Sequence, residues 1–200
     1  MVIRFTRTQE QILIFLLENP EEKNTIRGIS RKLKKSYTLV YNNIRDLEKK
    51  ETVKKQLVPP AQIVTLNEHA PLETFIDLEF KRKDNFLKKH PWAKVMLADI
   101  LKNINGPFFI LAVFGSYAKG LQNEKSDLDL LMIVNHKKEI KDAENAVQKA
   151  YAKVKKSLNV VDICDFKEMI KNTKNLNIGN EAKTHHILLY GIEGYYHLIR

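Results

Sequence analysis

Two short apolar segments, joined by a polar connection, constrain this chain more than any other part of its sequence. Residues 108–114 are all aliphatic or aromatic, and residues 130–134 form a second run of the same kind. Short runs of this composition are typical of buried strands rather than helices. The sequence therefore predicts two buried strands whose ends carry the polar residues that lie between them.

The polar residues at these strand ends are of the types that bind a metal ion and phosphates. Gly115 lets the backbone approach a ligand closely, and Ser116 adds a hydroxyl and, if a helix begins there, backbone N–H groups for an anion. Asp127 and Asp129 stand two positions apart, so on a strand both carboxylates face the same side. Such a pair repels itself unless a cation neutralises it, and Mg²⁺ or Mn²⁺ commonly bridges carboxylates to substrate phosphates.

The segment 115–130 resembles the active-site motif of the nucleotidyltransferase superfamily that includes DNA polymerase beta, in particular its minimal bacterial and archaeal members. The match is Gly-Ser-Tyr-Ala-Lys-Gly at 115–120, then five residues, then Ser-Asp-Leu-Asp-Leu at 126–130. Lys119 stands where such domains often carry arginine, so the charge is kept but the bidentate fork is lost. The alternative is a degenerate domain that keeps the fold and has lost the chemistry.

The resemblance implies the fold and the roles of the site residues. It implies an α+β domain with a mixed sheet flanked by helices, and a third carboxylate on a later strand, which we place at 159–166. The predicted catalytic and metal-binding residues are Asp127, Asp129 and Asp162. The predicted nucleotide-binding residues are Gly115, Ser116 and Lys119. The expected cofactor is Mg²⁺ or Mn²⁺ and the substrate a nucleoside triphosphate; the alternative for Asp162 is a solvated edge residue.

The first 66 residues predict a separate DNA-binding domain. Amphipathic helices are predicted over 6–19, 25–34 and 36–50, and two strand-like runs around paired prolines follow. This order resembles the winged helix-turn-helix domain of prokaryotic regulators, whose third helix enters the major groove. The residues expected to contact double-stranded DNA are Ser36, Tyr37, Thr38, Tyr41, Asn42 and Arg45. The alternative is a basic helix pair that packs on a partner domain.

Composition is consistent with these expectations. The net charge of +10 favours polyanionic partners such as nucleic acids and nucleotides. The lone Cys164, expected to be buried in an apolar strand, excludes a disulfide within the chain and favours a reducing, cytoplasmic setting. No apolar run approaches the length of a membrane span, so no membrane association is expected.

The remaining pattern predicts the domain organisation. We expect a winged helix-turn-helix over 1–66, a helical connector over 67–91 and the nucleotidyltransferase domain over 92–200. Aromatic residues of the connector are expected to pack between the domains, and a homodimer seam is the alternative. A charged amphipathic helix is predicted over 138–156, and a strand and a closing helix are predicted near the end.

The function expected from the resemblance is Mg²⁺-dependent transfer of a nucleoside monophosphate, expected to be AMP, to a hydroxyl acceptor. Fewer than forty residues follow Asp162, so we expect no large helical domain to grip a base or a long RNA. A protein hydroxyl is therefore a candidate acceptor, as in minimal family members that act as antitoxins by modifying a tyrosine of a partner toxin. The alternative is a DNA-binding transcriptional regulator whose nucleotidyltransferase domain senses nucleotide or is inactive; a self-repressing antitoxin would combine both.

Overall fold

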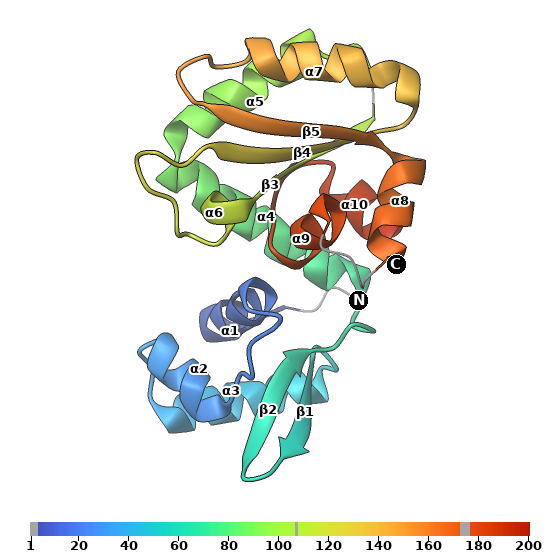
Figure 1. The fold of residues 1–200 in the computed structure, drawn as a ribbon. Helices are drawn as coiled ribbons and strands as arrows, with labels where there is room; N and C mark the ends of the chain where they lie inside the picture. Colours follow the sequence, from blue (N-terminus) through green and yellow to red (C-terminus); the bar gives the residue numbers. More distant parts are fainter. Residues whose placement is uncertain (1–3, 107, 173–176) are drawn as a thin grey trace. The chain divides into compact units, whose positions relative to one another are not determined.

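The computed structural model describes residues 4–106, 108–172 and 177–200, and the chain divides into two compact units, Met1–Leu78 and Glu79–Arg200. Figure 1 shows the elements of both units in sequence colours. Helix α4 (Leu72–Lys89) contains the boundary, so the predicted connector contributes residues to each unit. The predicted fold class is confirmed: the first unit has the winged helix-turn-helix arrangement and the second is a mixed sheet flanked by helices.

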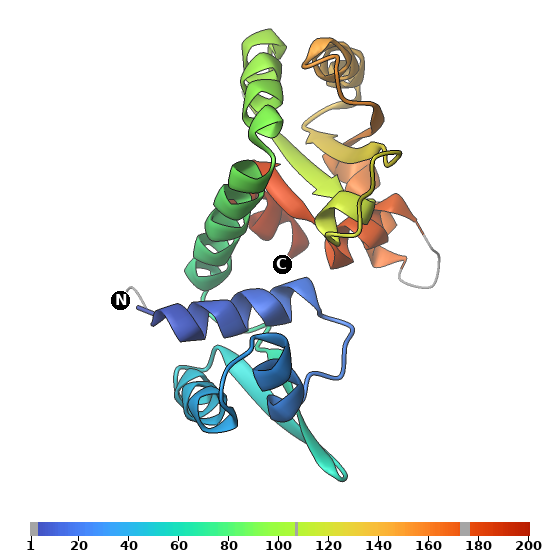
Figure 2. The ribbon, with the colours of Figure 1, turned by 90° about the vertical axis from the view of Figure 1, so that its left-hand side faces the viewer.

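Three helices begin the first unit (Figure 2). A hydroxyl side chain caps each of them. Thr6, Thr25 and Ser36 each accept a hydrogen bond from a backbone N–H of the first turn, which satisfies a donor that has no partner inside the helix. These caps explain the starts of α1 (Arg7–Glu18), α2 (Ile26–Lys32) and α3 (Tyr37–Lys49).

A two-stranded hairpin completes the first unit and forms the wing. Strand β1 (Val53–Val58) pairs antiparallel with β2 (Ala61–Leu66), and a bridge between Thr25 and Ile63 joins the hairpin to the start of α2. Buried aliphatic side chains from the helices and both strands form one core, among them Leu13, Ile29, Ile44, Val53 and Val64.

The second unit is built on a four-stranded mixed sheet with the order β5-β4-β3-β6. The central β3 (Phe109–Phe114) is antiparallel to β4 (Leu128–Val134) and to β6 (Ile187–Tyr190), whereas β4 is parallel to β5 (Lys156–Asp162). All six residues of β3 are buried, which explains why this strand reads as a continuous apolar run.

Helices cover both faces of this sheet (Figure 1). One face packs against α5 (Pro91–Asn103), α7 (Ile140–Lys149) and the end of α4. The opposite face is covered by α8 (Ile163–Lys171), α9 (Ile178–Thr184) and α10 (Ile192–Ile199). The short α6 (Gly115–Ala118) follows β3, and a 3₁₀ turn, η1 (Lys137–Glu139), precedes α7. Among the helices of the described residues, none has the length and apolar character needed to cross a bilayer.

Two predicted elements are wrong at their boundaries. The helix predicted over 138–156 ends at Lys149, because Ala150 is extended and Tyr151 takes a left-handed φ of 37°. Strand β5 therefore begins earlier than the predicted 159–166 and ends at Asp162, where α8 starts. Cys164 consequently lies on a helix and is exposed, which corrects its expected burial in a strand.

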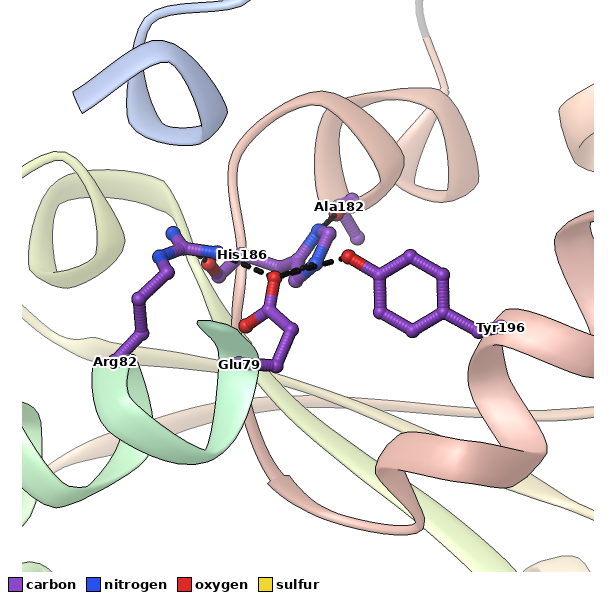
Figure 3. A network of polar contacts seen from close by, with 5 residues as sticks. All are labelled: Glu79, Arg82, Ala182, His186 and Tyr196. Atoms are coloured by element: carbon purple, nitrogen blue, oxygen red, sulfur yellow. Dashed lines mark hydrogen bonds and ion pairs between the residues drawn. The ribbon is translucent and has the colours of Figure 1, made fainter. Parts of the chain in front are cut away.

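A buried polar network ties α4 to the end of the chain within the second unit (Figure 3). Arg82 pairs with Glu79 at 2.6 Å, and its other terminal nitrogen donates to the carbonyl of His186, also at 2.6 Å. The Tyr196 hydroxyl donates to the same Glu79 oxygen at 3.2 Å. Burial alone would raise the pKa of Glu79, but the neighbouring Arg82 and His186 outweigh it and hold that pKa below its ordinary value.

Replacing Arg82 by alanine is expected to destabilise the protein by about 3–5 kcal/mol, because the Glu79 carboxylate would remain buried without its main partner. Denaturant unfolding followed by circular dichroism measures this loss. The exposed Lys88→Ala on the same helix removes an equal charge and should stay within about 0.5 kcal/mol of wild type. Equal losses in the two variants would contradict the role assigned to the network.

Candidate active site

The end of β3 and the start of β4 meet at one edge of the sheet. Phe114 pairs with Asp129, so Gly115 lies directly beside this aspartate. Gly115 has a φ of 64°, and a Cβ atom at this position would overlap the Asp129 carboxylate. Both the left-handed backbone and the missing side chain are needed here, so the position requires glycine.

Asp129 lies in a region where negatively charged side chains gather. Ser157 lies opposite it on β5, and its side chain acts to lower the pKa of the Asp129 carboxyl. Burial raises the pKa of Asp129, and the charges of Glu181 and Asp127 raise it further. Asp127 lies just before β4 and pairs with Lys155 at 2.8 Å. The structure thus brings together the two aspartates predicted from the sequence, with a third carboxylate nearby.

The predicted nucleotide-binding residues surround the same edge. Ser116 is the second residue of α6 and is partly exposed, and Lys119 follows that short helix. The Lys119 ammonium lies 3.2 Å from a carboxylate oxygen of Glu181 on α9. The sequence did not indicate Glu181, because the segment 167–183 was predicted to be a helix and loop and contains no motif that marks a site residue. The packing of α9 against β3 brings it to the site, and no local pattern encodes that contact.

Asp162 lies at the other end of the sheet. In the parallel register of β4 and β5, Asp129 faces Ser157 and Val134 faces Asp162. Asp162 therefore stands five positions along β5 from Ser157, which is roughly 16 Å at the usual rise per residue. Its carboxylate is buried and accepts the backbone N–H of Asp165 at 2.8 Å, which caps α8. This placement corrects the prediction that Asp162 shares a metal-binding face with Asp127 and Asp129.

The donor set fits a divalent cation that is shared with a substrate. Asp127 and Asp129 supply hard oxygen ligands, and the excess negative charge around Asp129 favours a cation. Across residues 4–106, 108–172 and 177–200, no group of three or more acidic, histidine or cysteine side chains is arranged to hold a metal alone. Mg²⁺ is commonly bound by one or two carboxylates together with substrate phosphates.

The residues predicted to contact DNA lie on the solvent side of α3. Val40, Ile44 and Leu47 of this helix are buried in the core of the first unit. The Tyr37 and Tyr41 rings are exposed and stack with their centroids 6.1 Å apart. All six predicted residues are exposed: Ser36, Tyr37, Thr38, Tyr41, Asn42 and Arg45.

Comparison with known proteins agrees with the site. Residues 96–183 match the family model described as a nucleotidyltransferase domain, and this range contains the whole acidic edge with Gly115, Asp129 and Glu181. Over these residues the second unit is thus similar to a nucleotidyltransferase domain. The match supports the prediction that the chain is a nucleotidyltransferase.

The other comparisons add little. No curated protein matches the chain. A solved structure with some likeness is the crystal structure of a MepR point mutant from a multidrug-resistant S. aureus clinical isolate. It is 18% identical over 49% of this chain and 75% of that chain, and its TM-score of 0.35 supports no conclusion about either unit.

Asp129→Asn is expected to stabilise the metal-free protein at neutral pH, because ionising this carboxyl costs free energy in the folded state. The pKa of Asp129 in the folded protein lies above its ordinary value of 3.8, so the unfolded chain ionises first as the pH rises. Wild type therefore loses stability as the pH rises from the ordinary pKa to the pKa in the folded protein. The melting temperature of the variant should therefore equal that of wild type at low pH and exceed it at neutral pH. Thermal unfolding across this pH range tests the sign, and an equal gain in Asp142→Asn, an exposed acid on α7, would contradict it.

Proposed function

We propose that this chain transfers a nucleoside monophosphate from a nucleoside triphosphate to a hydroxyl group, with Mg²⁺ or Mn²⁺ as cofactor. The observation that supports the proposal is the close contact of Gly115 and Asp129, which lies within the residues that match the family model. In the proposal, the turn at Gly115 binds phosphate beside the acidic start of β4. In this reaction the acceptor oxygen bonds to the α-phosphorus and its proton passes to a base. The bond to the β-phosphate breaks, and pyrophosphate leaves with the electron pair.

Each residue of the edge has a role in this reaction. Asp127 and Asp129 would hold the cation, which would neutralise charge on the phosphates as they react. The Ser116 hydroxyl would donate to a phosphate oxygen, and Gly115 lets the backbone approach closely. Lys119 would add a positive charge near the β- and γ-phosphates. Asp162 has no part in this scheme, because its carboxylate caps α8.

ATP is the proposed donor and a protein hydroxyl the proposed acceptor, as in the antitoxin-like members that the motif resembles. The open character of the edge supports an acceptor of this size. The side chains of Lys119 and Lys155 are 36% and 81% exposed, so the carboxylates that they contact lie at the surface of the unit. A side chain of another protein can therefore approach the acidic edge.

Incubation with α-labelled ATP and Mg²⁺, in the presence of cell lysate, is expected to transfer label to a protein in a metal-dependent manner. The double variant Asp127→Asn, Asp129→Asn should lower the rate by about 10³-fold, because the charges that hold the cation are lost. Asp162→Asn is the matched control: asparagine caps a helix as well as aspartate, so the rate should be unchanged. Transfer by the double variant at the wild-type rate would refute the assignment.

A second proposed function, binding of double-stranded DNA, rests on the exposed side of α3. Hydroxyl, amide and guanidinium groups gather there, and these groups contact bases and phosphates in DNA complexes. The neighbouring α2 adds exposed basic residues that can neutralise phosphates, namely Arg27, Arg31 and Lys32. DNA binding without nucleotide transfer would favour the alternative of a regulator with a nucleotide-sensing or inactive domain.

Duplex binding measured against salt concentration is expected to weaken steeply, and Arg45→Ala should reduce the logarithmic salt slope by about 0.9, the loss of one phosphate contact. Lys94→Ala, an exposed charge on α5 in the second unit, should leave the slope unchanged. Absence of duplex binding at low salt would remove this function.

A further inference from the structure

We propose that Glu181 is the third carboxylate of the active site and acts there in the role that the sequence assigned to Asp162. The inference rests on the proposed function. In the free protein Glu181 is paired with Lys119, and in the proposed cycle this pair separates when a nucleotide and a metal ion bind. Lys119 then turns to the triphosphate, and Glu181 turns to the cation held by Asp127 and Asp129.

The position of Glu181 is the first argument. It lies in the first turn of α9, and α9 packs against β3, the strand that ends at Gly115. Its carboxylate lies 3.2 Å from the ammonium of Lys119, which directly follows the short α6 that begins at Gly115. Glu181 therefore lies next to the turn whose first residue packs against the Asp129 carboxylate.

The contact between Lys119 and Glu181 is the second argument. Their side chains are 36% and 43% exposed, and exposed ion pairs of this kind contribute little to stability. A triphosphate offers Lys119 several negative charges, and a divalent cation offers Glu181 a stronger partner than one ammonium. Exchange of partners therefore costs little, and it leaves both residues neutralised in the bound state.

The third argument is the buried polar network that holds the backbone of α9 next to Glu181. The adjacent Ala182 is buried, and its carbonyl lies 2.7 Å from Nδ1 of His186 (Figure 3). His186 is in turn held by Arg82, which donates to its carbonyl, and by Glu79. The buried network thus fixes the backbone of α9 next to Glu181, while the carboxylate itself remains exposed and free to change partner. Residues that bind a metal ion are commonly held in position by hydrogen bonds among the residues next to them.

Glu181→Gln tests the proposal, because it removes the charge and keeps the size of the side chain. Glu168→Gln, an exposed glutamate on α8, is the matched control for the loss of one negative charge. Trp92 is the only tryptophan of the chain, and its ring lies 6.0 Å from that of Tyr117 in α6. Tryptophan fluorescence can therefore report on binding at the turn that contains Ser116.

Two titrations are expected to move in opposite directions in Glu181→Gln. Without metal, ATP should bind more tightly than to wild type, because Lys119 is released and one repelling charge is gone. With a non-hydrolysable ATP analogue present, Mn²⁺ should bind about tenfold more weakly, because a carboxylate of the site is lost. Nucleotide transfer should fall as well, and Glu168→Gln should match wild type in all three measurements.

The outcomes separate this inference from the proposed function. If Glu181→Gln matches Glu168→Gln in both titrations while the double aspartate variant loses Mn²⁺ binding and transfer, the role of Glu181 is refuted and the proposed function stands. If both ligands bind Glu181→Gln more weakly and its melting temperature falls, Glu181 has only a structural role. If the double aspartate variant keeps Mn²⁺ binding and transfer, the proposed function itself fails.

Discussion

The close contact between the Gly115 backbone and the Asp129 carboxylate is the constraint on which the site depends. It exists because β3 and β4 pair in a register that places Phe114 opposite Asp129. The residues of both strands are almost entirely buried, so a slip of one position would turn their alternating side chains to the wrong faces. The packing of the sheet therefore fixes the geometry of the chemistry at its edge, although no core residue takes part in that chemistry.

The same edge illustrates a conflict between stability and function. Asp127, Asp129 and Glu181 gather negative charge that the folded protein must bear without its substrate. The two lysines that pair with Asp127 and Glu181 are exposed, so they offset this repulsion only in part. The buried network around Glu79 has the opposite character, because its opposed charges lie inside the unit and hold the elements behind the site in place.

Much of the fold follows from local sequence patterns. The apolar runs before Gly115 and after Asp129 predicted β3 and β4, and the capping residues and helical periodicity of the first unit predicted its three helices. The segment 159–166 was predicted as one strand from its apolar residues, but its second half begins α8. The capping carboxylate of Asp162 marks the end of β5 and the start of α8, and the left-handed Tyr151 follows the end of α7. Glu181 could not be found from the sequence, because only the packing of α9 on β3 brings it to the site.

Cys164 is exposed rather than buried in a strand as expected, and this exposure has a practical consequence. It is the only cysteine of the chain and lies exposed on α8, the helix that Asp162 caps at the far end of β5. A maleimide dye would therefore attach at one defined position, away from Asp129, without any engineered thiol. The natural sequence is thus ready for anisotropy measurements and for energy transfer to a labelled nucleotide or duplex.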